Sequence, residues 1–357
     1  MRFPALLLLP GLLAAQSMTV EEYTPKSSLV VPEHPTTRAK YPFIDVHNHQ
    51  RFPMSKEQLD KLVADMDSIN LQVMVNLSGR YGDQFKAGID SVRAAYPKRF
   101  IVFANLNFND IDAPDYGQRA ASQLEQDVKN GASGLKFFKN FGMDLKDTKG
   151  QRIHIDDPRF DPVFETCARL KIPVLIHTAD PKQFWEPVDK YNERWYELNE
   201  IPGRRRDPAK NASWDELIAE QHNLFRRHKK TIFIDAHLGW LGGDLARLAK
   251  LLDECPNVNT EIGAVLAELG RQPRTAREWF TRYQDRVLFG KDTWNPVEYH
   301  TYFRVLETAD EYFPYYRRRH AFWMMYGLEL PDDVLRKLYY KNALRLVPGI
   351  DPSAFPQ

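Results

Sequence analysis

Short apolar runs typical of buried strands alternate with longer amphipathic stretches along the chain from Tyr41 onward. The amphipathic stretches predict a helix that begins at Ser55, a helical tail from about 297, and helices at 84–96, 117–130, 160–170, 213–228, 244–254 and 274–284. The apolar runs predict strands at 41–48, 71–78, 99–106, 133–139, 172–178, 231–237, 257–262 and 286–291. Eight strand–helix units make up a (β/α)8 TIM barrel. We therefore expect one α/β domain over 41–350 and a short tail at 351–357.

The same alternation would also suit a doubly wound sheet, which carries a glycine-rich phosphate loop after its first strand when it binds dinucleotides. No Gly-x-Gly-x-x-Gly pattern follows 41–48, and polar residues fall at the strand ends, which favours the closed barrel. The connection after the fifth strand, about 180–211, is long enough to predict a lid or binding loop. Two predicted helix starts carry a capping pattern, Ser55 with Gln58 and Ser213 with Glu216.

Composition excludes several classes of protein. The chain has 357 residues, of which 43% are hydrophobic and 27% charged, and its 21 Phe, 16 Tyr and 7 Trp require a large core, which excludes disorder along the whole length. The formal net charge is only +1, so there is no electrostatic reason to expect a nucleic-acid partner. Two cysteines, Cys167 and Cys255, cannot form a disulfide framework or a cysteine-based zinc site.

The first residues have a composition of their own. Arg2 is followed by an apolar run from Phe3 to Ala15, which is shorter than the about 20 residues that a membrane-spanning helix needs. We interpret 1–16 as a signal peptide of a secreted or periplasmic protein, with an uncleaved anchor as the alternative, and 17–40 as a linker or irregular arm. No stable membrane insertion is expected.

Candidate metal ligands fall at the ends of four predicted strands. The first strand ends in Asp45-Val46-His47-Asn48-His49, and the alternation of a strand places Asp45, His47 and His49 on one face. A His-x-His pair alone is weak support, because ten histidines in this chain give about 0.3 such pairs by chance. Three further strand ends carry His177, His237 and Asp292. In a barrel these ends share one rim, and their nitrogens and carboxylate suit a zinc-type divalent ion.

This set of positions resembles the amidohydrolase superfamily, and within it the amidohydrolase-related branch that includes aminocarboxymuconate-semialdehyde decarboxylase. The likeness covers nearly everything from Tyr41 to about Leu346. By that resemblance one divalent metal ion, with Zn²⁺ preferred over Mn²⁺ and Fe²⁺, would be bound by His47, His49, His177 and Asp292. The resemblance also implies that His237 is the acid/base group beside a metal-bound water and that Asp292 orients this water. Asp235 is either an orienting residue for an imidazole or a polar residue of the barrel core.

Lysines on the fourth strand raise the question of a second metal, because some superfamily members hold two ions on a carboxylated lysine there. Lys136 and Lys139 lie on opposite faces of a strand, so only one of them can point inward. We expect a single ion, with one of these lysines as a cation for the substrate. Arg51, just beyond His49, is a further candidate for a substrate carboxylate. Trp185 in the long loop either lines a pocket or packs on the barrel.

These features predict a metal-dependent hydrolase in which metal-activated water attacks an amide, ester or lactone carbonyl of a small carboxylate-bearing molecule. The first alternative is a non-oxidative decarboxylase of an aromatic or muconate-like acid, which the same ligand set would serve. The second is a non-catalytic periplasmic barrel that only holds a ligand. A small molecule is the expected partner, and a homo-oligomer is left open.

Overall fold

The computed structural model describes residues 18–19, 22–320 and 323–356. The chain forms two units, Met1–Pro32 and Glu33–Gln357, and the described part of the first contains no helix or strand. The predicted signal peptide at 1–16 lies outside the described residues. Within the described parts, no helix is long and apolar enough to cross a membrane.

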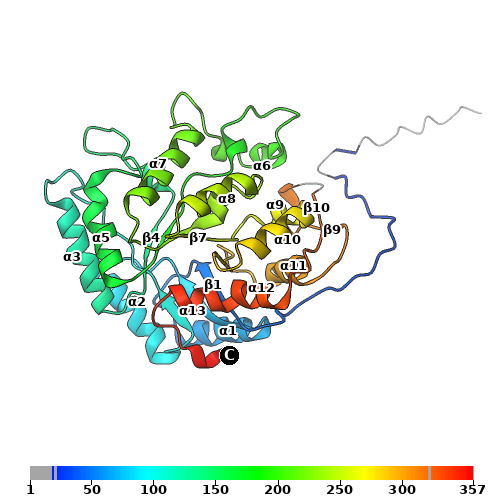
Figure 1. The fold of residues 1–357 in the computed structure, drawn as a ribbon, viewed down its shortest axis with the longest axis horizontal. Helices are drawn as coiled ribbons and strands as arrows, with labels where there is room; N and C mark the ends of the chain where they lie inside the picture. The colour runs from blue at the N-terminus through cyan, green and yellow to red at the C-terminus, as the bar shows by residue number, and fades with distance from the viewer. Residues whose placement is uncertain (1–17, 20–21, 321–322, 357) are drawn as a thin grey trace, which may run out of the picture. The chain divides into compact units, whose positions relative to one another are not determined.

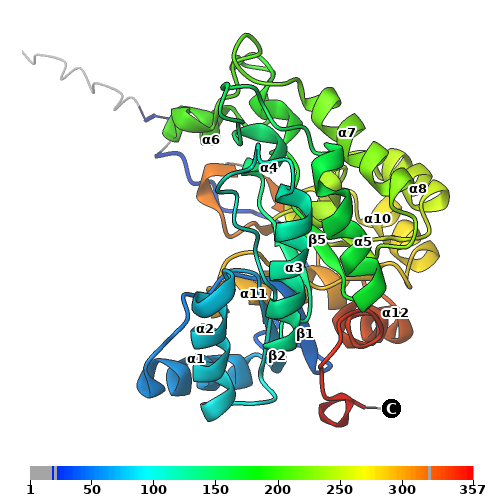
Figure 2. The same cartoon turned by 90° about the vertical axis from the view of Figure 1, so that its left-hand side faces the viewer.

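The second unit alternates strands and helices as the hydrophobic pattern predicts, and the helices lie outside the strands in both views (Figures 1 and 2). The strands are β1 Phe43–Asn48, β2 Leu71–Asn76, β3 Phe100–Val102, β4 Leu135–Phe137, β5 Val174–Ile176, β6 Phe233–Asp235, β7 Val258–Glu261 and β8 Val287–Leu288. The principal helices between them are α1 Lys56–Ser68, α2 Gly82–Ala95, α3 Tyr116–Lys129, α5 Asp161–Leu170, α7 Trp214–Arg227, α8 Leu245–Glu254 and α10 Pro273–Arg282.

The eight strands are parallel and pair in chain order as two sheets, β1-β2-β3 and β4-β5-β6-β7-β8. Backbone hydrogen bonds join the sheets on one side, where Ala104 donates to Gly134 and Lys136 donates to Ala104, both at 2.9 Å. They join them on the other side, where Val46 donates to Phe289 at 2.9 Å. The strands therefore form the ring of a barrel, and their carboxyl ends share one rim.

The first residues of α1 and α7 show whether the two predicted capping boxes form. At α1 the full capping box forms, because Ser55 accepts from the Gln58 backbone and Gln58 accepts from the Ser55 backbone. At α7 the Ser213 hydroxyl accepts from the Glu216 N–H at 3.1 Å, but the Glu216 carboxylate pairs with Arg152 instead of returning to Ser213. The prediction of a reciprocal box at Ser213 is wrong because a guanidinium is the stronger partner for this carboxylate.

Two regions differ in detail from the expected pattern. The long connection after β5 is not structureless, since it contains α6 Trp195–Glu200 and short 3-10 turns. The expected helical tail consists of α11 Pro296–Glu307, α12 Asp332–Arg336 and α13 Asn342–Leu346. An antiparallel pair, β9 Phe313–Pro314 and β10 Met324–Met325, separates α11 from α12. Strands of two residues are too short to leave a periodic signal in the sequence.

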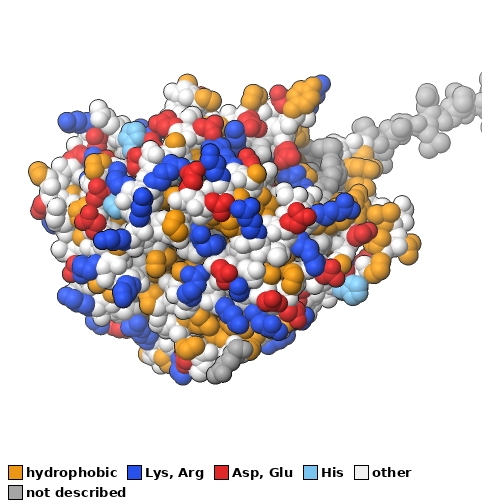
Figure 3. Space-filling view, viewed as in Figure 1, with side chains coloured by type: hydrophobic (Ala, Val, Ile, Leu, Met, Phe, Trp, Pro, Cys, Tyr) orange, Lys and Arg blue, Asp and Glu red, His pale blue; other side chains and the backbone are white. Residues whose placement is uncertain are grey.

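The surface and the cysteines fit an ordinary folded domain. Positive and negative side chains are mixed over the face in Figure 3, with hydrophobic side chains scattered between them. Cys167 and Cys255 are buried and free. Burial raises the pKa of both thiols, which disfavours the reactive thiolate.

Candidate metal centre at the barrel rim

The carboxyl ends of β1 and β8 bring three of the expected ligands together. Asp292 donates its backbone N–H to the His47 carbonyl at 2.6 Å, which ties the segment after β8 to β1. The Asp292 Oδ1 atom lies 3.4 Å from His47 Nε2 and 3.5 Å from His49 Nε2. The carboxylate therefore lies between two imidazoles whose ring nitrogens face it.

The ends of β5 and β6 bring the other two histidines to the same place. His237 Nε2 lies 3.3 Å from His177 Nδ1, and the His237 ring centroid lies 4.8 Å from that of His47. Ligand atoms of His47, His237 and Asp292 all lie within 4.8 Å of one another. The structure thus places the side chains that the sequence singled out at four strand ends in one cluster.

The backbone at the end of β6 explains how His237 reaches this cluster. His237, Leu238, Gly239 and Trp240 form a left-handed turn with φ between 54° and 59°. Single residues visit this region at a cost of about 1–2 kcal/mol each, and a run of them is rare. Asp292 also has a positive φ, 81°. Strained backbone of this kind gathers at functional sites, where it holds a side chain in one direction.

Hydrogen-bond partners fix which nitrogens of the imidazoles keep a free lone pair. The Glu261 carboxylate accepts from His47 Nδ1 at 2.9 Å, so the lone pair of His47 is on Nε2. The Gly263 carbonyl can only accept, so His237 carries its proton on Nδ1, 2.7 Å away, and accepts from His177 Nδ1 through Nε2. The lone pair of His177 is then on Nε2. Among the described residues, neither His47 Nε2 nor His177 Nε2 has a hydrogen-bond partner, and both are buried.

The charge states favoured by burial are those of a metal site. Burial lowers the pKa of His47 and His177 well below the ordinary value and that of His237 to about 4, so all three are neutral at pH 7. Burial opposes ionisation of Asp292, but the imidazole of His49 and its neighbours hold the pKa of Asp292 well below its usual range. Neutral imidazoles and an ionised carboxylate are the forms that bind metal. The two buried, unpartnered Nε2 atoms and the carboxylate fit a divalent ion of zinc or manganese type.

Lys136 is the lysine of β4 that points inward. Its side chain is 2% exposed, and Nζ has no hydrogen-bond partner among the described residues. Burial lowers its pKa to about 8, and Asp292 and Glu261 act in the opposite direction. Lys139 instead forms an ion pair with Asp180 at 2.6 Å. The expectation that only one of the two lysines faces inward is confirmed.

Phe138 lies near both Lys136 and His49. Its ring centroid lies 5.5 Å from Lys136 Nζ and 5.5 Å from that of His49. Phe138 is 36% exposed, so its ring borders both the cluster and the solvent. A buried cation and an exposed aromatic ring thus lie beside the cluster.

Two expected substrate contacts, Arg51 and Trp185, have other surroundings. Arg51 is exposed in the loop after β1, and Trp185 donates its indole N–H to the Ala212 carbonyl at 2.8 Å. In the described parts of the chain, neither makes a hydrogen bond or a ring contact with the clustered imidazoles. The Trp185 contact fits the packing alternative.

Of the two alternatives for Asp235, an orienting residue for an imidazole or a polar residue of the barrel core, the structure supports the second. Its Oδ1 accepts from Gln221 of α7 at 2.7 Å and not from an imidazole. A Cβ at Gly239 would lie 2.4 Å from its Oδ2, so only glycine fits in the turn above it. Asp235 is thus a buried residue of the barrel core whose hydrogen bond goes to α7.

Two of the three arginines in the run after α6, Arg204 and Arg206, are paired, whereas Arg205 is exposed as a charge run predicts. Arg206 pairs with Asp180 at 2.6 Å, and Arg204 pairs with Glu197. Because both acids belong to the same long connection, these arginines hold it in shape.

Sequence reasoning missed two residues of the site. Glu261 ends β7, where the criterion applied to the other strands, a titratable side chain at the carboxyl end, would have found it. Trp240 stacks on His237 with ring centroids 4.7 Å apart. No signal pointed to Trp240, because its position depends on the left-handed turn.

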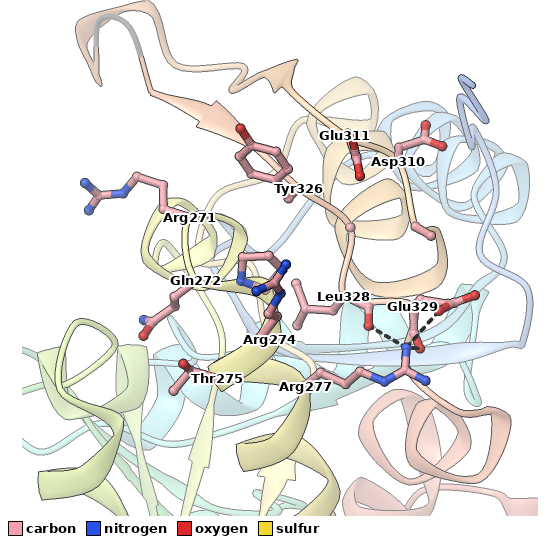
Figure 4. Close-up of a pocket in the computed structure, with 13 residues that line it drawn as sticks. Arg271, Gln272, Arg274, Thr275, Arg277, Asp310, Glu311, Tyr326, Leu328 and Glu329 are labelled. Atoms are coloured by element: carbon pink, nitrogen blue, oxygen red, sulfur yellow. Dashed lines mark hydrogen bonds and ion pairs between the residues drawn. The ribbon is translucent and has the colours of Figure 1, made fainter. Parts of the chain in front are cut away.

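A hollow of about 630 Å³ lies beside α10, and two of the three arginines that line it, Arg271 and Arg277, are already paired (Figure 4). Arg277 donates to the Leu328 carbonyl at 2.9 Å and pairs with Glu329, while Arg271 pairs with Glu193 at 3.2 Å. Paired guanidinium groups leave little reason for an anion to bind. The rim cluster, with its unpartnered nitrogens, is the stronger candidate site.

Comparisons with known proteins agree with this fold. A family model described as Amidohydrolase matches residues 44–349. An uncharacterised TIM-barrel protein from Bordetella bronchiseptica has TM-score 0.53 and 15% identity over 85% of this chain and 97% of its own. A 2,6-dihydroxybenzoate decarboxylase complexed with 2,6-dihydroxybenzoate has TM-score 0.54 and 16% identity over 86% and 99%.

A 5-carboxyvanillate decarboxylase from Novosphingobium aromaticivorans, complexed with manganese and 4-hydroxy-3-methoxy-5-nitrobenzoic acid, has TM-score 0.50 and 14% identity over 88% and 99%. At these identities the likeness shows the TIM-barrel fold alone. No curated protein matches the sequence.

Proposed function

The chain belongs to the amidohydrolase family, whose members are metal-dependent enzymes, and we propose that it is a hydrolase that binds one divalent ion at the barrel rim. Membership in this family argues against the non-catalytic alternative. The observation that carries the proposal is a pair of buried, unpartnered nitrogens, His47 Nε2 and His177 Nε2. His47 lies in one cluster with His237 and the Asp292 carboxylate, and His177 hydrogen-bonds to His237. A buried polar atom without a partner costs about 1–3 kcal/mol, so a ligand that satisfies both nitrogens would stabilise the protein.

His47, His49, His177 and Asp292 are the proposed metal ligands, with Zn²⁺ preferred because imidazole and carboxylate together suit it. When bound, the ion would supply a water of lowered pKa for attack on an amide, ester or lactone carbonyl. Asp292 would also accept a hydrogen bond from that water and so orient it.

His237 is the proposed acid/base group. Its Nε2 keeps a lone pair because Nδ1 donates to the Gly263 carbonyl, and it faces the cluster. It can therefore accept a proton at Nε2 and return it to the leaving group. Trp240 stacked on the ring restricts its rotation.

Lys136 is the proposed anchor for a negatively charged substrate group. A buried ammonium without a hydrogen-bond partner is costly, and a substrate carboxylate or oxyanion would satisfy it. Phe138 beside it would contact the carbon skeleton of the substrate. Arg51 and Trp185 remain proposals for groups of the substrate farther from the metal.

The same unpaired cation favours a second reaction, decarboxylation of an aromatic or muconate-like acid. A carboxylate beside Lys136 and the metal ligands could be the group that leaves rather than a handle for binding. Both reactions use the same ligands and the same acid/base group, so the product distinguishes them.

Metal analysis and a substrate panel test the proposal. One equivalent of zinc or manganese in the purified protein is expected, and two would instead support a carboxylated Lys136. Lactones, esters and amides are then assayed for acid release, and aromatic and muconate-like acids for CO₂. A protein that binds no divalent ion after reconstitution would contradict the proposal.

We also propose that the protein is exported, on the basis of its apolar N-terminal run. Mass spectrometry of protein expressed in a bacterial host tests this. A mature chain that begins near residue 17 in the extracytoplasmic fraction is expected, and an intact N-terminus in the cytoplasm would contradict it.

A further inference from the structure

Glu261, at the end of β7, is a buried carboxylate that contacts both sides of the proposed metal centre. Its Oε1 accepts from His47 Nδ1 at 2.9 Å and from the backbone N–H of His237 at 2.7 Å. Its Oε2 accepts from the backbone N–H of Gly263 at 2.5 Å. Three N–H donors, one in β1 and two in the segments that follow β6 and β7, thus converge on two oxygens.

This arrangement determines the chemistry of both imidazoles. By accepting from Nδ1 of His47, Glu261 leaves Nε2 as the nitrogen with the lone pair. By holding Gly263, it keeps in place the carbonyl that accepts from Nδ1 of His237. Which ring nitrogen carries the lone pair, in the ligand His47 and in the acid/base group His237, therefore depends on this one carboxylate.

The carboxylate has no room to move. A Cβ at Gly290 would lie 2.2 Å from its Oε2, and a Cβ at Gly263 would lie 2.8 Å from the same atom. Backbone that carries no side chain therefore encloses Glu261 on two sides. Side chains that are locked in this way hold a neighbouring group to a narrow range of orientations.

We propose that Glu261 is the positioning residue of the metal centre, which orients His47 for coordination through Nε2 and fixes His237 beside it. The inference rests on the proposed function, because it assigns a role toward the metal that His47 would bind. A carboxylate behind a metal-bound imidazole also raises its basicity, and loss of such a partner costs about 10- to 100-fold in metal affinity.

Glu261→Gln is the informative variant because it keeps the size of the side chain. The amide oxygen can still accept from His47 and from the His237 backbone, but the amide N–H₂ then meets the Gly263 N–H, and the negative charge is gone. Asp235→Asn is the matched control. Asp235 is equally buried at the end of the neighbouring strand β6 and contacts Gln221 rather than an imidazole.

The experiment titrates Zn²⁺ into the metal-stripped full-length protein by calorimetry, with the thermal midpoint of each metal-free variant measured in parallel. Glu261→Gln is expected to bind Zn²⁺ about 10- to 100-fold more weakly, while Asp235→Asn binds within about twofold of wild type. Comparable weakening in both variants, or a loss that follows the fall in thermal midpoint, would mean a general structural effect and would overturn the inference.

Unchanged affinity in Glu261→Gln would also overturn it, while leaving the metal site intact. A wild-type protein that binds no Zn²⁺ would instead refute the proposed function itself. ¹⁵N spectra of the imidazoles add a readout that a structural role would not move. His47 is expected to carry its proton on Nδ1 in the metal-free wild type, and a proton on Nε2 would contradict the proposed orientation.

Discussion

Among the described residues, two groups of three side chains have ligand atoms close enough to hold one ion, and they differ in how those atoms are partnered. The groups are His47, His237 and Asp292 at the barrel rim, and His154, Asp156 and Glu220 beside α7. In the rim group, His47 Nε2 is buried and lacks a hydrogen-bond partner among the described residues. In the second group, Arg152 binds Glu220 through both oxygens, at 2.6 and 2.9 Å.

The difference shows that residue type and spacing alone do not identify a metal site. The second group also has an exposed histidine, His154 with 54% of its side chain accessible, and its carboxylate is neutralised by a guanidinium. A metal ion there would have to displace Arg152 from Glu220. At the rim, an ion would satisfy atoms that the protein leaves unpaired.

The largest expected effect comes from removing a rim ligand. His47→Ala is expected to abolish stoichiometric metal binding, because the three remaining ligands would have to hold the ion without the buried imidazole that faces the Asp292 carboxylate. His154→Ala is the control and should keep one equivalent. Metal analysis after dialysis measures both. Metal loss in His154→Ala, with retention in His47→Ala, would reverse the comparison.

The next effect separates a ligand from an acid/base group within the rim cluster. His237→Asn is expected to keep the metal and lower kcat by about 10²- to 10⁴-fold on a substrate found in the panel, because proton transfer is lost. His177→Asn should lose the metal. His237 Nε2 lies 3.3 Å from His177 Nδ1, so the two neighbouring rings need separate variants to assign their roles. Metal loss in His237→Asn with retention in His177→Asn would exchange their roles.

The sequence predicted those residues of the rim cluster that lie at the carboxyl ends of strands. His47, His177 and Asp292 each follow an apolar run, and parallel strands in a ring must bring their ends together. Glu261 obeys the same rule and was missed because no role was assigned to the end of β7. Trp240 could not be found, since its place beside His237 depends on a left-handed turn that alternation does not predict.

The hydrophobic periodicity of the sequence predicted the fold. The predictions that were wrong concern side chains for which a distant partner competes with a local one. All eight strands occur where the apolar runs predict them, with shorter bounds. The expected return bond from Glu216 to Ser213 fails because Arg152, 64 residues away, takes that carboxylate. No local pattern can reveal such a partner.

A smaller effect tests how tightly the rim is packed. Gly290→Ala is expected to lower the free energy of unfolding by about 1–3 kcal/mol and to weaken metal binding, because the new methyl group would meet Glu261 Oε2. Gly243→Ala, with nothing within 4 Å of the added Cβ, is the control and should change neither. Urea unfolding and Zn²⁺ titration measure the two effects. A neutral Gly290→Ala would show that the carboxylate can move.

The smallest effect on the proposed chemistry is expected at the group beside α7, where the Glu220 carboxylate contributes to stability and not to metal binding. Burial opposes ionisation of Glu220, but hydrogen bonds from Arg152 and the Ile155 backbone hold its pKa below the ordinary value. Its contribution to stability is therefore complete above the unfolded pKa of about 4.3 and is lost as the pH falls through the lower folded value. Glu220→Gln should cost about 2 kcal/mol at pH 7 and progressively less toward pH 3, with unchanged metal binding.

Urea unfolding of wild type and Glu220→Gln at several pH values measures this difference. The sign of this difference separates the two groups. An anion held by Arg152 stabilises the fold without metal, whereas at the rim His47 Nε2 and His177 Nε2 would gain a partner from a bound ion. A difference that grows as the pH falls would mean that Glu220 is protonated beside Arg152. In that case its oxygens would not be neutralised by the guanidinium, and the contrast between the groups would lose its physical basis.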